Sequence, residues 1–70
     1  MKVFESPRKL FVASQEGDKT YVLRDQHLTP IGTLSAETLG IYPKANSFSA
    51  FSVVELEELV ALIRKIEKYH

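Results

Sequence analysis

The C-terminal end of the chain constrains the fold more than any other part, because it specifies where one long helix starts. Ser52 is an N-cap residue, and Glu55, three positions later, completes a capping box. Phe51 and Leu56 flank this cap at the positions of a hydrophobic staple. We therefore predict a single helix over residues 53–69.

The apolar residues of this helix extend over an arc of roughly 180°, whereas a stripe of roughly 100° is enough to pack a helix against one sheet. The residues expected to face the core are Leu56, Leu59, Val60 and Ile63. The residues expected to remain free, as an interaction surface, are Leu62, Ile66 and Tyr69. The excess width predicts that the helix serves association as well as the fold.

Charged residues are sorted along the helix, with acidic side chains in the first turns and basic side chains in the last. They are Glu55, Glu57, Glu58, Arg64, Lys65, Lys68 and His70. This order compensates the helix macrodipole by about 0.3–1 kcal/mol per well-placed charge, which is the favoured interpretation. The same order would also let two such helices pair antiparallel, with acidic residues against basic ones.

The chain has only 70 residues and no cysteine. A domain of this length buries about 60% of the surface that its unfolded chain exposes, and small domains often depend on disulfides, metals or partner chains. Without cysteine, disulfides and thiolate metal sites are excluded, and His27 and His70 show no zinc-ligand spacing. No cofactor is expected, and a partner chain is the remaining source of added stability.

Short runs rich in β-branched and aromatic residues, separated by turn signals, predict a small antiparallel sheet upstream of the helix. Two strands over residues 9–14 and 20–24 flank a turn in which Gly17 can adopt a positive φ. A short third strand is expected over residues 31–34. Residues 1–5 are a candidate edge strand.

The segment between this sheet and the helix lacks a regular pattern. Residues 35–40 predict one helical turn, which is capped by Ser35 and ended by Gly40. Residues 41–49 are expected to be irregular because Pro43 and its neighbours interrupt any apolar period.

The predicted fold class is α+β: a small antiparallel β-meander of two to four strands packed against one long C-terminal α-helix. Residues 1–70 form a single domain, with a meander over residues 9–34, an irregular segment over residues 35–51 and then the helix. The expected core comprises Leu10, Val12, Tyr21, Leu23, Ile31, Leu34, Leu56, Leu59, Val60 and Ile63. The choice of sheet face stays open, because a shift of one residue inverts it.

No residue pattern indicates a catalytic site. Asp25 and His27 lie close together in a turn, but neither a third ligand nor an activated serine accompanies them. The carboxylates near the helix start suit capping and the macrodipole, and Gly17, Gly32 and Gly40 match no phosphate-binding loop. The chain is therefore not expected to be an enzyme.

Nine basic and nine acidic residues leave no net charge, so no long-range field gathers nucleic acid or anionic membrane. The first residues lack the apolar run of a signal peptide, and no segment approaches the ~18 apolar residues of a membrane span. We therefore expect a cytoplasmic protein without membrane contact.

An aromatic-rich irregular segment over residues 42–51 has two interpretations. In the favoured one, Phe48 and Phe51 fill the core between sheet and helix. In the other, the segment forms an exposed contact patch that comprises Tyr42, Lys44, Asn46 and Phe48.

The leading functional hypothesis is a small non-enzymatic protein–protein interaction module. It would act as a homo-oligomer, such as a homodimer, or as an adaptor or inhibitor of a larger protein. One alternative, which the zero net charge disfavours, is nucleic-acid binding by the basic N-terminal side of the sheet: Lys2, Arg8 and Lys9. Another is the binding of a small anionic ligand in an intersubunit pocket near Arg24, His27 and Lys44.

Overall fold

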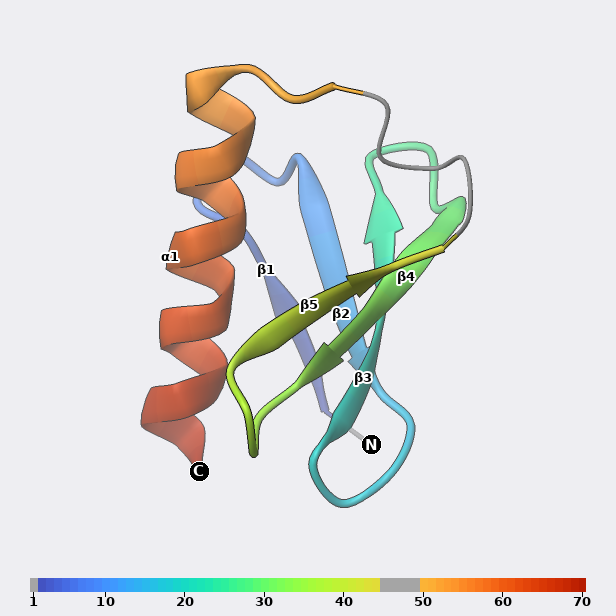
Figure 1. Ribbon diagram of the computed structural model, residues 1–70, viewed down its shortest axis with the longest axis vertical. Helices are drawn as coiled ribbons and strands as arrows, with labels where there is room; N and C mark the ends of the chain where they lie inside the picture. The colour runs from blue at the N-terminus through green and yellow to red at the C-terminus, as the bar shows by residue number, and fades with distance from the viewer. Residues whose placement is uncertain (1, 45–49) are drawn as a thin grey trace.

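The computed structural model describes residues 2–44 and 50–70, which form one antiparallel sheet and one helix (Figure 1). In chain order the elements are β1 (Val3–Glu5), β2 (Phe11–Gln15), β3 (Thr20–Asp25), β4 (Pro30–Ser35), β5 (Gly40–Pro43) and α1 (Val53–Tyr69). The strands lie in the sheet in this same order. The predicted α+β class is confirmed, whereas the predicted number of strands, two to four, is too low, because the described residues form five.

Helix α1 begins where its capping signal predicts. Ser52 Oγ accepts a hydrogen bond from the backbone N–H of Glu55 at 3.2 Å, and Glu55 Oε1 accepts one from the backbone N–H of Ser52 at 2.9 Å. These reciprocal bonds satisfy backbone donors that a helix start otherwise leaves unpaired. At the other end, the backbone N–H of His70 donates to the carbonyl of Ile66.

The turn between β4 and β5 corrects the predicted helical turn over residues 35–40. Ser35 Oγ accepts hydrogen bonds from the backbone N–H groups of Glu37 and Thr38, both at 3.2 Å. A serine that caps backbone N–H groups in this way serves a tight turn as well as a helix start, so the residue type alone does not distinguish the two. The segment is the turn of a β-hairpin.

Strand β5 is a second correction in this region. Residues 41–49 are predicted to be irregular, yet Ile41 pairs with Leu34 of β4, and the strand extends to Pro43. Proline is tolerated there because β5 is an edge strand, where a missing N–H costs no ladder hydrogen bond. The remainder of the predicted irregular segment, residues 45–49, lies outside the described residues.

The apolar core lies between the inner face of the sheet and α1. It comprises Phe11, Ala13, Tyr21, Leu23, Ile31, Leu34, Leu59, Leu62 and Ile66. The four core residues predicted from β3 and β4 are confirmed. The predictions for β2 and for the helix need correction.

Strand β2 turns its other face inward. Phe11 and Ala13 are buried, whereas the predicted core residues Leu10 and Val12 are only half-buried. Ala13 lies opposite the buried Leu23 of β3, so both side chains point to the same face. The ring of Phe11 also meets that of Phe51 edge to face, with centroids 5.8 Å apart. These long-range partners decide the face, which the pattern of the strand left open.

Helix α1 also presents a different face from the predicted one. Leu62 and Ile66 are fully buried, although they were expected to be free, whereas Leu56 and Val60 are 50% and 56% exposed. The other two helix residues predicted for the core are Leu59, which is buried, and Ile63, which is half-buried. The helix is therefore rotated about its axis relative to the predicted orientation.

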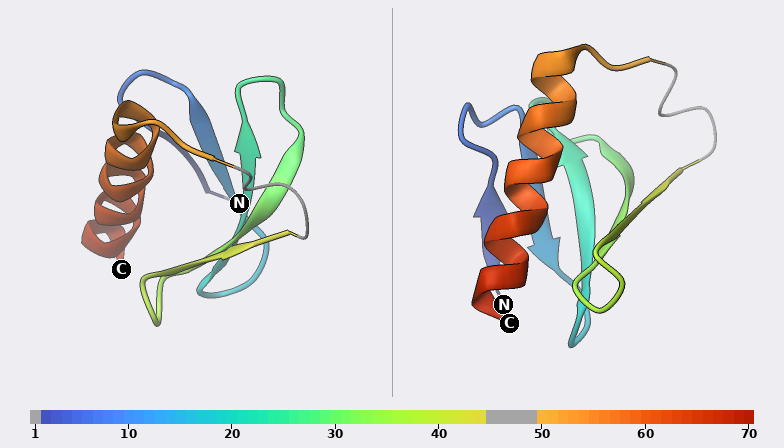
Figure 2. Two further views of the ribbon diagram at one scale, coloured as in Figure 1. Left: turned by 45° about the horizontal axis from the view of Figure 1, so that its top comes forward. Right: turned by 60° about the vertical axis from the view of Figure 1, so that its left-hand side comes forward.

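In this orientation α1 lies beside β1, an edge strand of the sheet (Figure 2). Phe4 of β1 contacts the rings of Tyr21 and Tyr69 edge to face, at centroid distances of 5.8 and 5.4 Å. Lys65 Nζ donates a hydrogen bond to the backbone carbonyl of Glu5 at 2.8 Å. These contacts draw the C-terminal half of the helix toward β1, so the flank predicted to be free lies over the sheet.

Two buried polar side chains tie the β1–β2 turn to the core. Ser6 Oγ accepts a hydrogen bond from the backbone N–H of Phe11 at 3.0 Å. Glu58 of α1 is 5% exposed and accepts a hydrogen bond from the backbone N–H of Arg8 at 2.7 Å. Each bond gives a partner to a backbone N–H group that the sheet ladder does not pair.

The buried hydroxyl of Tyr21 closes the opposite end of the core. It lies 2.7 Å from Nε2 of His70, at the end of α1. Burial raises the pKa of Tyr21 above its ordinary value of 10.0, and the nearby Tyr69 and Asp18 raise the pKa further.

Within residues 2–44 and 50–70, no helix is both long enough and apolar enough to cross a membrane.

The orientation of α1 can be tested with two leucine-to-alanine substitutions. Leu62→Ala is expected to lower the free energy of unfolding by about 2–5 kcal/mol, because it leaves a cavity in the core. Leu56→Ala makes the same chemical change on a half-exposed side chain and is expected to cost less than about 1 kcal/mol. Urea unfolding followed by circular dichroism measures both losses. Equal losses would contradict the orientation.

The raised pKa of Tyr21 predicts a loss of stability at high pH. The folded state keeps the phenol proton over a pH range in which the unfolded chain loses it. This contribution to stability is complete below about pH 10 and declines as the pH rises through the folded-state pKa. The melting temperature of the wild type should therefore fall relative to that of Tyr21→Phe above about pH 10. A difference that stays constant up to about pH 11 would contradict this prediction.

Candidate functional site

The outward side of α1 carries a line of apolar side chains, which we call the free stripe: Val53, Leu56, Val60 and Ile63. The spacings of three, four and three residues place these side chains along one line of the helix. Val53 is 72% exposed, Leu56 and Val60 are about half exposed, and Ile63 is half-buried at the edge of the core. Among the described residues, no strand lies over the side of α1 that is turned away from the sheet (Figure 2).

A hollow of about 210 Å³ adjoins the free stripe where α1 faces the β4–β5 turn. Leu39, Val60, Ile63 and Arg64 line it. Leu39 adopts φ 56° in the turn, a left-handed conformation that costs a leucine roughly 1–2 kcal/mol. Its side chain stands beside the helix, so the strained turn adds apolar surface next to the free stripe.

Charged side chains border one side of the free stripe. Glu57 and Arg64 are seven residues apart, which is nearly two helical turns, so they lie on the same flank of α1. Arg64 Nη1 lies 2.9 Å from Glu67 Oε1 in an exposed ion pair. Glu67 itself lies at the C-terminal end of the stripe. The surface is therefore an apolar line with a charged border, an arrangement typical of a contact surface.

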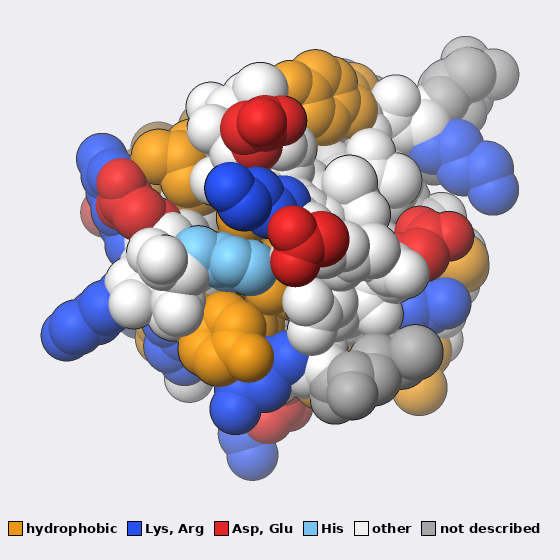
Figure 3. Space-filling view, turned by 90° about the horizontal axis from the view of Figure 1, so that it is seen from below, with side chains coloured by type: hydrophobic (Ala, Val, Ile, Leu, Met, Phe, Trp, Pro, Cys, Tyr) orange, Lys and Arg blue, Asp and Glu red, His pale blue; other side chains and the backbone are white. Residues whose placement is uncertain are grey.

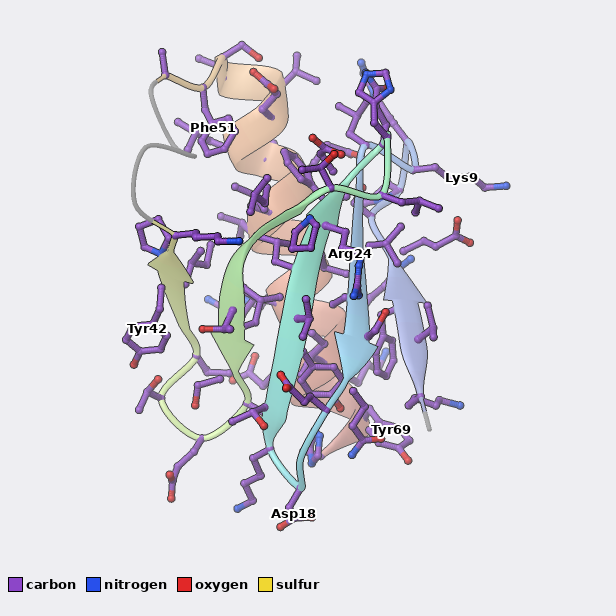
Figure 4. The ribbon with its side chains drawn as sticks, turned by 90° about the vertical axis from the view of Figure 1, so that its right-hand side faces the viewer. Lys9, Asp18, Arg24, Tyr42, Phe51 and Tyr69 are labelled. Atoms are coloured by element: carbon purple, nitrogen blue, oxygen red, sulfur yellow. The ribbon has the colours of Figure 1, made fainter. Side chains whose placement is uncertain are left out.

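The outer face of the sheet, opposite α1, is a second exposed surface (Figure 4). Two hollows of about 430 and 360 Å³ meet there at Val22. Tyr42 and Lys44 line the first hollow, whereas Arg24 and Ser14 line the second. Arg24 Nη1 donates a hydrogen bond to Ser14 Oγ at 3.4 Å. Polar and apolar side chains alternate across the strands of this face, as the pairs Ser14–Val22 and Val22–Thr33 show.

The residues predicted for the helix interaction surface have a different role. Leu62 and Ile66 are core residues, so the prediction that they are free to meet a partner is wrong. Tyr69 is 52% exposed, but its ring packs against Phe4, and Lys2 Nζ lies 5.2 Å from its ring centroid. The predicted excess of apolar helix surface does exist, and it lies on the opposite flank of the arc.

The predicted loop patch is described only in part. Tyr42 and Lys44 both line the hollow of about 430 Å³ on the outer face. Tyr42 also shares a hydrogen bond of 2.7 Å with Thr38 across the β4–β5 turn. Asn46 and Phe48 lie outside the described residues.

The three residues predicted to hold an anionic ligand line three different hollows. Arg24 and Lys44 belong to the two hollows of the outer face, whereas His27 lines one of about 190 Å³ near the start of α1. Asp25 Oδ1 accepts hydrogen bonds from the backbone N–H groups of His27 and Thr29, at 2.9 and 3.0 Å. This carboxylate therefore closes the β3–β4 turn. Within the described residues of a single chain, these three side chains therefore do not form one ligand site.

The basic residues considered for nucleic-acid binding are also separated. Lys2 lies at one end of β1, and Arg8 and Lys9 lie in the turn after its other end, where Lys9 points away from the sheet (Figure 4). At the end of the molecule seen in Figure 3, acidic and basic side chains are mixed. The described part of that face carries no broad patch of one sign to attract a polyanion.

Sequence reasoning missed the free stripe by assigning Leu56 and Val60 to the core and leaving Leu39 without a role. The signal that could have identified it is Phe4, the single aromatic residue in the candidate edge strand. An inward aromatic residue at that edge draws the helix toward β1, which exposes the other flank.

Comparison with known protein families, curated proteins and solved structures finds no match to this chain.

Proposed function

We propose that this chain is a non-enzymatic protein–protein interaction module whose contact surface is the free stripe together with Leu39. The observation that carries the proposal is the exposure of Leu56 and Val60, each about one half, beside a core whose described members do not include them. Removing such side chains from water is favourable by roughly 25 cal/mol per Å² of apolar surface.

The free stripe differs from scattered apolar residues on a surface. One exposed leucine is ordinary, whereas contiguous apolar surface marks interaction sites. Here four apolar side chains follow one line of α1, and the hollow beside Leu39 extends the line toward the sheet. A helix held by its buried face also presents these side chains in fixed positions, which lowers the entropic cost of binding.

A binding role is favoured over catalysis because several carboxylates are engaged in holding the backbone. Asp25 closes the β3–β4 turn, Glu55 caps α1 and Glu58 binds the β1–β2 turn. Two kinds of partner suit the free stripe: a second copy of this chain, or a larger protein with an apolar surface of its own, on which this chain would act as an adaptor or inhibitor.

Site-specific photocrosslinking tests the proposed surface in the cells that make the protein. A photoreactive residue at Val60 should form a protein adduct, because the partner covers this position, whereas one at Val22 on the outer face should not. Leu56→Glu in the same chain should abolish the adduct by placing a charge in the apolar contact. Val54→Glu, on the same helix away from the stripe, is the matched control and should leave the adduct unchanged.

The mass of the adduct separates a second copy from a larger protein. Adducts in equal yield at Val60 and Val22, adducts that survive Leu56→Glu, or no adduct at Val60 would each contradict the proposed surface. Circular dichroism of each variant shows that the fold is retained.

A further inference from the structure

The geometry of the free stripe points to a second copy of this chain as its partner, in an antiparallel pair of α1 helices. We infer a two-fold axis that passes between Val60 and Ala61, so that the middle of each stripe meets the middle of the other. This inference rests on the proposed function, because it names the partner of the same surface. It goes further in predicting register, direction and charge pairing.

The charges that border the stripe suit this direction. Glu57 and Arg64 lie on the same flank and are equally far from the proposed axis, on opposite sides of it. An antiparallel pair therefore brings Glu57 of each copy beside Arg64 of the other. A parallel pair in register would instead place like charges together, which disfavours association.

The apolar side chains also match across the proposed axis. The two Val60 side chains meet at the centre of the pair. With a rise of about 1.5 Å per residue, Leu56 of one copy comes to within about one turn of Ile63 of the other, on the flank away from Glu57. The contact thus has an apolar centre, an apolar flank that continues to Leu39 and a charged flank.

The two helix macrodipoles are antiparallel in this pairing, which is their favourable direction. The contact involves one helix and one turn from each copy, which is small beside the roughly 800 Å² per partner of a standard interface. We therefore expect a reversible dimer that forms as concentration rises.

Analytical ultracentrifugation tests the association itself. The measured mass of the wild type should rise from the 7.9 kDa of one chain toward twice that value over a concentration range of about a thousandfold. Val60→Glu should keep the chain monomeric throughout, because it places two carboxylates at the centre of the pair. Val54→Glu, the matched control away from the stripe, should associate like the wild type.

Charge exchange tests the register and the direction. Glu57→Arg and Arg64→Glu alone should each associate more weakly than the wild type, because each homodimer then holds two like-charge contacts. An equal mixture of the two variants restores both opposite-charge contacts in a heterodimer. The mixture should associate roughly five- to tenfold more tightly than either variant alone, and salt at about 0.5 M should reduce this difference.

Each outcome bears on the inference separately from the proposed function. A wild type that remains monomeric over the whole concentration range overturns the dimer, while a Val60 adduct with a different protein still supports the interaction module. A dimer that is insensitive to Val60→Glu overturns this interface. A dimer in which the mixed charge variants show no preference for each other overturns the antiparallel register. Unfolding of each variant in urea confirms that weaker association does not result from loss of the fold.

Discussion

The packing of Leu59, Leu62 and Ile66 against the inner face of the sheet is the contact on which the rest of the structure depends. A chain of 70 residues without cysteine has no disulfide to limit its unfolded state, so apolar burial must hold helix and strands together. The buried hydrogen bonds of Ser6 and Glu58 add to this contact, because they give partners to backbone groups of the β1–β2 turn.

Burying one flank of α1 decides what the other flank can do. An apolar arc of roughly 180° is wider than the sheet can cover, so part of it must face solvent in an isolated chain. Because Phe4 and β1 draw the helix toward one edge of the sheet, the exposed part contains Leu56 and Val60. The proposed contact surface is thus a consequence of the fold, since the same rotation that completes the core leaves this stripe uncovered.

The turns show which local features follow from residue type and which do not. The sequence correctly predicts a hairpin around Gly17, but the reason offered, a positive φ at glycine, is wrong. No glycine has a positive φ, whereas Lys9, Leu28 and Leu39 do. Such residues are rare in the left-handed region because their Cβ meets the backbone, so residue type does not predict them there. The helical turn expected near Ser35 failed similarly, because the same hydroxyl cap forms in a β-turn.

By itself the sequence determined the features that depend on neighbours along the chain: the capped start of α1, the width of its apolar arc and the alternation that puts Tyr21 and Leu23 on one face of β3. The tertiary structure alone decided which faces of β2 and α1 are buried, because those choices depend on partners far away in the chain. Ala13 faces inward through its pairing with β3, and Leu62 through the position of β1 beside the helix. A periodic pattern defines a face, whereas only the packing partner determines which way that face turns.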